Sequence, residues 1–168
     1  YIFIDPQPEE EYSFNERKRL FDNCLNWDQY KFNPQDPNSA NAGIYLKTDK
    51  QIKLSKAAAD LLKIPQETSP TEIIRAILLL DVDVLWNGGI GTYIKASGET
   101  NEQVKDSAND QVRINANQLN AKIVIEGGNL GLTQAARIEA QLNKNIKVNT
   151  DFIDNSGGVD CSDHEVNI

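Results

Sequence analysis

Methionine is absent from the sequence, and histidine and cysteine are scarce. The 168 residues include one histidine, His164, and two cysteines, Cys24 and Cys161. About 2% of an average chain is methionine, so we expect this chain to be a piece of a longer protein. Two cysteines far apart in the sequence form neither a disulfide framework nor a zinc-binding pattern. A reducing, cytoplasmic environment is therefore the default expectation.

Long apolar runs and basic clusters are also missing. No run of about 18 apolar residues occurs, so no membrane-spanning helix is expected. The start, "YIFIDPQPEE", lacks the basic-then-apolar layout of a signal peptide. Asp and Glu number 25 against 17 Lys and Arg, for a net charge of −8. Surfaces that bind nucleic acid or anionic membranes need clustered Lys and Arg, and we expect neither partner.

The first 80 residues mix the end of a strand with helices and loops. A strand is predicted over 1–5, and short strands are predicted between 43 and 55. Helices are predicted over 13–21, 55–64 and 68–80. In the first helix, Ser13 and Glu16 have the spacing of a capping box, and Ser69 and Glu72 have it in the third. We interpret residues 1–80 as the end of a strand followed by an α-rich insertion.

Residues 81–168 alternate strands with helices. Strands are predicted over 81–89, 121–129 and 146–155, and helices over 101–112, 132–144 and from 156 onward. Ile138 and Leu142 lie on the expected apolar face of the helix at 132–144. Trp86 and Trp27 are expected to pack in a core or between domains, although Trp86 could instead shape a ligand cleft. This alternation predicts an α/β fold, a Rossmann-like parallel sheet of which the chain holds the second half.

Each predicted strand of this half is followed by two adjacent glycines and has an asparagine beside them. The pairs are Gly88–Gly89, Gly127–Gly128 and Gly157–Gly158, and the asparagines are Asn87, Asn129 and Asn155. In an open parallel sheet, ligands bind at the carboxyl ends of the strands. Glycine there lets a ligand approach the backbone, and an amide offers both a donor and an acceptor. The pattern suits a carboxamide or ribose hydroxyls, although such residues also form ordinary tight turns.

Fingerprints for phosphate binding are not found. "GGIGTY" (88–93) and "GGNLGLT" (127–133) do not match G-x-G-x-x-G, and no Walker P-loop occurs. A dinucleotide hypothesis must therefore place the pyrophosphate loop outside this chain.

The last stretch, "NTDFIDNSGGVDCSDHEVNI" (149–168), concentrates residues that could carry chemistry. One histidine and one cysteine among carboxylates make a poor metal-ligand set, so no metal site is expected. A nucleophilic pair of Cys161 and His164 would lack a third, orienting group. The better interpretation is that Asp160 and Asp163 lie in the first turn of a helix, where carboxylates are favoured.

Three blocks of the second half strongly resemble the large bacterial NAD-specific glutamate dehydrogenases. They are "DVDVLWNGGIGTYIKAS", "AKIVIEGGNLGLTQAARIE" and "NTDFIDNSGGVDCSDHEVNI". "YIFIDPQPEEEYSFNERKRLF" resembles the same enzymes, in the stretch after the second strand of their nucleotide-binding fold. The resemblance covers most of the chain and is weakest over 31–50. It implies NAD-dependent deamination of L-glutamate to 2-oxoglutarate and ammonia.

The resemblance also implies roles for particular residues. Gly88 and Gly89 fall where smaller enzymes of this type have two alanines along the cofactor. Asn129 falls on an asparagine near the nicotinamide ribose, and Asn155 on one that binds the nicotinamide carboxamide. Ser162 falls on a serine that reaches the carboxylate of the substrate.

The family's catalytic lysine, its acidic partner and most substrate ligands precede this chain. We therefore expect no catalytic residue within it, no activity of the chain alone, a catalytic domain upstream and a homo-oligomer when intact. At 87, 91–92 and 130–131 the chain has other residues than the smaller enzymes. The cofactor contacts of those enzymes are therefore not carried over to residues 90–92. Two alternatives are a non-catalytic regulatory or assembly module and a dehydrogenase of another amino acid.

Overall fold

The computed structural model describes residues 1–32 and 39–155. The chain divides into two compact units, Tyr1–Ala76 and Ile77–Ile168. Within the described residues, no helix has the length and apolar character needed to cross a membrane.

Unit 1 is built from helices and short antiparallel strand pairs. Its elements are β1 (Ile2–Ile4), α1 (Glu10–Asp22), β2 (Gly43–Tyr45), β3 (Ile52–Lys53), α2 (Lys56–Leu62), β4 (Glu67–Thr68) and α3 (Pro70–Leu78), of which the last continues into unit 2. β1 pairs with β2, and β3 pairs with β4. The predicted box at the start of α3 forms, because Ser69 Oγ accepts from the backbone N–H of Glu72 and the Glu72 carboxylate accepts from that of Ser69.

Helix α1 begins earlier than predicted. The Glu9 carboxylate accepts hydrogen bonds from the backbone N–H groups of Glu11 and Tyr12, so Glu9 is the N-cap. Ser13 is buried inside the helix, and Glu16 forms an ion pair with Arg19 at 2.6 Å instead of closing a capping box. The prediction of a helix start at Ser13 was wrong, because a carboxylate upstream satisfies the first free N–H groups.

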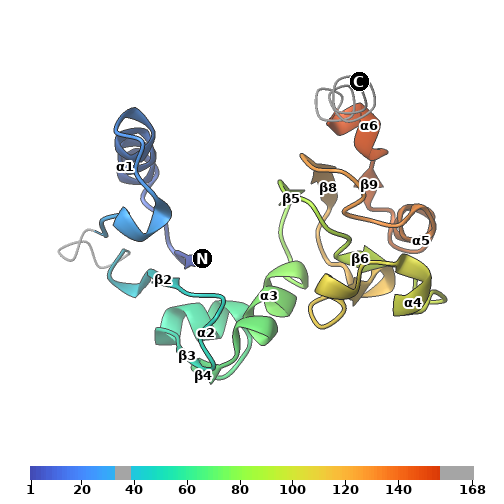
Figure 1. The fold of residues 1–168 in the computed structure, drawn as a ribbon, viewed down its shortest axis with the longest axis horizontal. Helices are drawn as coiled ribbons and strands as arrows, with labels where there is room; N and C mark the ends of the chain where they lie inside the picture. Colours follow the sequence, from blue (N-terminus) through green and yellow to red (C-terminus); the bar gives the residue numbers. More distant parts are fainter. Residues whose placement is uncertain (33–38, 156–168) are drawn as a thin grey trace. The chain divides into compact units, whose positions relative to one another are not determined.

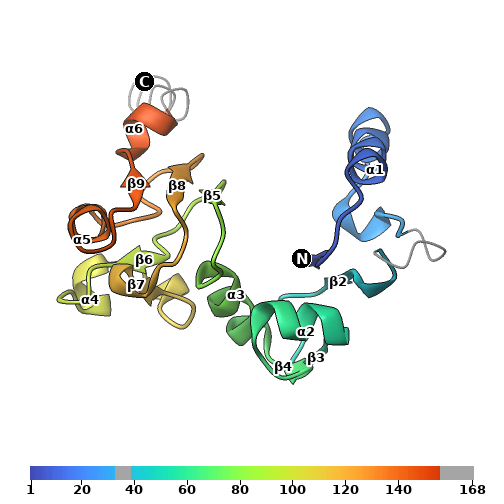
Figure 2. The same cartoon turned by 180° about the vertical axis from the view of Figure 1, so that it is seen from behind.

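Unit 2 contains the predicted parallel sheet. Its elements are β5 (Val84–Asn87), β6 (Ile94–Lys95), α4 (Asn101–Val104), β7 (Ile114–Asn115), β8 (Ile123–Glu126), α5 (Gln134–Lys144), β9 (Lys147–Val148) and α6 (Asp151–Asp154). β5, β8 and β9 lie side by side in that order and all run parallel (Figure 1). The reverse view shows α6 following directly at the end of β9 (Figure 2). The expected α/β, Rossmann-like arrangement is confirmed for this unit.

The two faces of the sheet differ in burial. Val124 and Glu126 on β8 are buried, at 1% and 0% exposed. Val124 shares a core with Ala136 and Ala140 of α5, and Glu126 pairs with Arg137 of the same helix. On the other face, Val84, Trp86 and Ile125 are 46%, 67% and 38% exposed. Because side chains alternate along a strand, β8 places Val124 and Glu126 in the core and Ile125 on the exposed face. Val84 and Trp86 of β5 extend that exposed apolar face.

Two elements of unit 2 are shorter than predicted. The polar helix at 101–112 ends at Val104, because Lys105 adopts a left-handed conformation with φ 61° and caps it. The third strand ends at Val148 instead of continuing to 155. Residues Asp151–Asp154 form helix α6. Phe152 and Ile153 are both exposed, so the apolar pair that suggested a strand belongs to a helical turn.

Two side-chain placements in unit 2 also differ from expectation. The face of α5 that packs on the core consists of Ala136, Arg137 and Ala140, whereas Ile138 and Leu142 are exposed. Trp86 does not pack in a core of the described residues. Its indole instead lies against the backbone of Gly127.

Candidate functional site

The loops that follow β5 and β8 touch each other at the carboxyl edge of the sheet. The backbone N–H of Gly127 donates to the carbonyl of Asn87 at 2.8 Å. A Cβ placed on Gly128 would lie 2.0 Å from the carbonyl oxygen of Gly89, closer than atoms can approach. Glycine at 128 is therefore required for the two loops to close on each other.

Two of the predicted amide side chains meet at this edge. Asn155 Nδ2 donates to Asn129 Oδ1 at 2.9 Å, joining the loop after β8 to the end of α6. Both residues are half-buried. The contact uses one N–H of Asn155 and the carbonyl of Asn129. By the inventory of an amide side chain, the pair keeps an acceptor at Asn155 Oδ1 and donors at Asn129 Nδ2.

A buried ion pair lies beneath the loop after β8. Glu126, the last residue of that strand, accepts from Arg137 of α5 through Nε at 3.1 Å and Nη2 at 2.6 Å. Its second oxygen accepts from the backbone N–H of Gly131 at 2.7 Å. Because Glu126 is 0% exposed, its charge is balanced within the protein and not by solvent.

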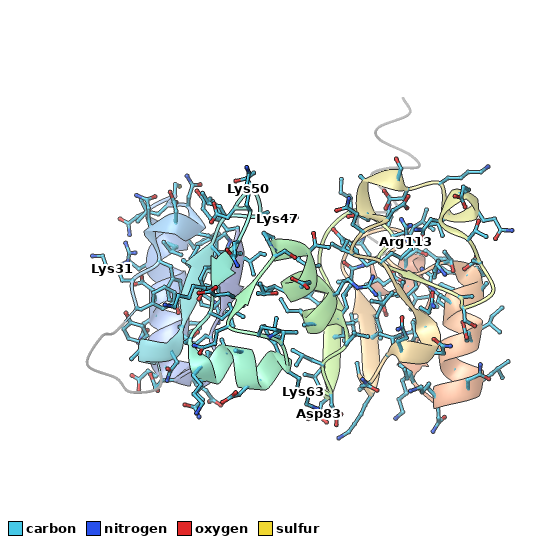
Figure 3. The ribbon with its side chains drawn as sticks, turned by 90° about the horizontal axis from the view of Figure 1, so that it is seen from below. Lys31, Lys47, Lys50, Lys63, Asp83 and Arg113 are labelled. Atoms are coloured by element: carbon cyan, nitrogen blue, oxygen red, sulfur yellow. The ribbon has the colours of Figure 1, made fainter. Side chains whose placement is uncertain are left out.

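A second cluster of polar side chains holds the loop after β5. Asp106 Oδ2 accepts from the backbone N–H of Thr92 at 2.7 Å and from Asn109 Nδ2 at 2.8 Å. Arg113, whose side chain is 0% exposed, donates to the carbonyl of Thr92 at 2.8 Å. Figure 3 shows Arg113 among the side chains of unit 2. Thr92 Oγ1 donates to the carbonyl of Leu130 at 2.7 Å, so this cluster also reaches the loop after β8.

This cluster predicts a loss of local stability in acid. The hydrogen bonds from Asn109 and then from the Thr92 backbone lower the pKa of Asp106. Partial burial opposes them, and the charge of Arg113 lowers the pKa by a smaller amount. A lowered folded-state pKa means that the stabilisation is complete above the unfolded value, about pH 4, and is lost as pH falls through the folded-state pKa. We expect Asp106→Asn to ease the opening of 91–114 by about 1 kcal/mol at pH 7. This difference should shrink as the pH falls below about 4 and through the folded-state pKa, as measured by hydrogen exchange on the full-length protein.

The matched control is Asp83→Asn. Asp83 pairs with Lys122 at 2.6 Å, but their side chains are 81% and 73% exposed, and Figure 3 shows Asp83 at the periphery. Exposed pairs of this kind contribute little, so this variant should leave exchange unchanged at pH 7 and at pH 3. An Asp106→Asn effect that is the same at pH 7 and pH 3 would contradict the assignment.

The predicted site residues divide into those that the structure describes and those that it does not. Gly88 and Gly89 are exposed at the carboxyl edge. They follow β5, the strand that pairs with β8, and Asn129 follows β8. Ser162, the third glycine pair and the residues Asp160 to His164 lie outside the described residues. Over 1–32 and 39–155, no group of three metal-ligating side chains is found.

The buried partners Glu126 and Arg137 were not predicted as part of the site. A signal for both exists in the sequence. The alternation of a strand places Glu126 on the same face as Val124, and the helical period places Arg137 between Ala136 and Ala140. Glu126 and Arg137 carry opposite charges on the buried faces of a strand and a helix. If these two faces pack together, an ion pair between the residues is expected.

A depression lies at the other end of the sheet. It is lined by 119–123 and 144–147, and its volume is about 520 Å³. These residues surround the amino ends of β8 and β9, whereas ligands of open parallel sheets bind at the carboxyl ends. We therefore place the candidate site at the glycine loops and not in this depression.

Comparisons with known proteins agree along the whole chain. The family model described as "Bacterial NAD-glutamate dehydrogenase, catalytic domain" matches residues 1–168. Proteins named NAD-specific glutamate dehydrogenase are 49% identical over 170 residues in Halomonas elongata, 51% over 172 in Pseudomonas aeruginosa and 47% over 176 in Mycobacterium tuberculosis. Each alignment covers the whole of this chain but only 10 or 11% of the relative.

Proposed function

Since the chain belongs to the family of bacterial NAD-glutamate dehydrogenase catalytic domains, we propose that it forms the nicotinamide side of the NAD site in such an enzyme. The full-length protein would convert L-glutamate, water and NAD⁺ to 2-oxoglutarate, ammonia and NADH. Unit 2 would bind the cofactor, and the residues that act on glutamate would come mainly from other parts of the protein. Ser162 would contact the substrate carboxylate.

The observation that carries this proposal is the Asn129–Asn155 amide pair at the carboxyl edge of three parallel strands. A carboxamide needs one acceptor and one donor, which are the groups that the pair retains. The loop at Gly88 and Gly89 adds a surface without side chains on the neighbouring strand. A Cβ on Gly89 would meet nothing within 4 Å. Both features fit a flat ring with a carboxamide substituent.

The chain's own residues would orient the cofactor. NAD accepts the hydride from the substrate when it is bound. Asn155 and Asn129 would fix the rotation of the nicotinamide ring by hydrogen-bonding its carboxamide. Gly88 and Gly89 would leave room for the ring against the backbone. Hydride transfer is sensitive to small misplacements, so these positioning contacts contribute directly to the rate.

Gly89→Leu tests the position of the cofactor. Since space around Gly89 is open, the variant should fold. Its side chain would occupy the surface proposed for the cofactor, and the Kd for NADH should rise at least about tenfold, equivalent to about 1.4 kcal/mol. Titration of the full-length protein with NADH measures this change.

The matched control is Gly98→Leu. A Cβ on Gly98 also meets nothing within 4 Å, and this residue lies in a turn after β6 instead of at the carboxyl edge. It should leave the Kd for NADH unchanged. Equal NADH affinity in both variants and the wild type would remove Gly89 from the cofactor site.

A further inference from the structure

We infer that Asp151 is a positioning residue for the cofactor: with the Glu126–Arg137 ion pair, it fixes the two segments that present Asn129 and Asn155. This inference rests on the proposed function, because it assigns a role to residues that would act through the two amides. None of the three side chains needs to touch the cofactor for this role.

The network begins at the loop that carries Asn129. The next residue, Leu130, has a left-handed backbone with φ 57°, a conformation that a residue with a Cβ rarely adopts. The backbone N–H of Leu130 donates to Asp151 Oδ2 at 3.0 Å. The N–H of Gly131 donates to Glu126 Oε2 at 2.7 Å. Two carboxylates from different elements therefore hold consecutive amides of an unfavourable turn.

Carboxylates at both ends of α6 hold this helix against the rest of unit 2. Asp151 is its first residue, and Asp151 Oδ1 lies 3.4 Å from Arg137 Nη2, the nitrogen that also binds Glu126. At the other end of α6, Asp154 Oδ2 accepts from the backbone N–H of Glu126 at 3.3 Å. Asn155 follows immediately.

Arg137 connects the two segments. Its side chain is 6% exposed and contacts Glu126, at the start of the Asn129 loop, and Asp151, at the start of α6. A guanidinium group with fixed geometry can bridge two carboxylates in only a narrow range of positions. The separation of Asn129 and Asn155 is therefore set through Arg137 and Asp151.

A purely structural role for Asp151 predicts a different result from a positioning role. If Asp151 acts through the amide pair, its removal matters less once Asn155 is absent, because only Asn129 is then left to be positioned. A double-mutant cycle separates the two cases, because independent effects add and coupled effects do not.

The experiment measures the Kd for NADH in the full-length protein with Asp151→Ala, Asn155→Ala and both changes. Asp151→Ala removes the acceptor of the Leu130 N–H and should raise the Kd about tenfold. In the Asn155→Ala background it should add about twofold or less. The conservative variant Asp151→Asn keeps an acceptor for Leu130 but loses the charge that faces Arg137, so its Kd should lie between those of the wild type and Asp151→Ala. The KM for glutamate should stay unchanged in all variants.

The outcomes are distinguishable. If Asn155→Ala leaves the Kd for NADH unchanged, the proposed cofactor site is overturned and this inference with it. If Asn155→Ala weakens binding but Asp151→Ala has no effect, or the same effect in both backgrounds, only the positioning role is overturned. A Kd for Asp151→Asn as high as that for Asp151→Ala, or a KM for glutamate that rises with the Kd for NADH, would also overturn the positioning role. If Asp151→Ala does not fold, the same cycle with Asp151→Asn decides the question.

Discussion

Replacing Arg137 by methionine should open the sheet edge more than any other change at a single side chain described above. Glu126, 0% exposed, would keep its carboxylate in the core without a counter-charge. Removing one partner of a buried ion pair costs about 3 to 5 kcal/mol. Hydrogen exchange on the full-length protein should show this loss at 123–131, where the β8 strand and its loop depend on Glu126. Unit 1 should exchange as in the wild type.

Two further variants test whether the unpaired Glu126 charge causes the faster exchange in Arg137→Met. Lys144→Met makes a similar change at an exposed position of the same helix, and it should leave exchange over 123–131 unchanged. Adding Glu126→Leu to Arg137→Met removes the unpaired charge and should recover part of the loss, since apolar replacements of both partners are often tolerated. Recovery should be incomplete, because the N–H of Gly131 loses its acceptor. Wild-type exchange in Arg137→Met alone would show that the ion pair does not hold this edge.

Gly128→Ala should separate the two glycine loops. The added Cβ would lie 2.0 Å from the Gly89 oxygen and 2.7 Å from its carbonyl carbon, and both are backbone atoms that cannot rotate away. Overpacking of this kind costs about 3 kcal/mol. The loops must move apart, so we expect faster exchange over 87–92 and 127–131. NADH binding by the full-length protein should also be lost.

Gly89→Ala is the matched control for this variant. It adds the same methyl group to the opposite loop, where nothing lies within 4 Å of the new atom. Exchange over both loops should match the wild type. If Gly128→Ala and Gly89→Ala behave alike, the close contact between the loops is not maintained in solution.

Much of unit 2 could be predicted from short stretches of sequence. Apolar runs ending in Gly-Gly predicted β5 and β8, and their parallel pairing follows from the helix-containing connection between them. Asn129 lies just after β8, as predicted, whereas Asn155 reaches the same edge through α6 and not at the end of a strand. Their hydrogen bond was not predicted from the sequence. Their binding of a cofactor stays a proposal.

The errors arose where local patterns compete. "NTDFIDN" (149–155) contains an apolar pair typical of a strand, yet the stretch is helical, and in this helix Asp151 accepts from the Leu130 N–H and Asp154 from the Glu126 N–H. The apolar spacing of 132–144 suggested a face through Ile138 and Leu142. The buried face instead contains Arg137, because its partner Glu126 lies on a separate element. This pairing is a tertiary contact between β8 and α5, so the pattern of residues within the helix alone cannot predict it.

The hydrogen bonds of the loop at 127–131 have a consequence for entropy. Its backbone N–H groups at 127, 130 and 131 are bound, and the carbonyls of Leu130 and Gly131 accept from Thr92, Tyr93 and Ile94. Ordering a flexible backbone costs about 1 to 2 kcal/mol per residue. This loop is already ordered by its hydrogen bonds in the folded protein. Ligand binding therefore costs it little further conformational entropy. Affinity at this edge can therefore come from few contacts.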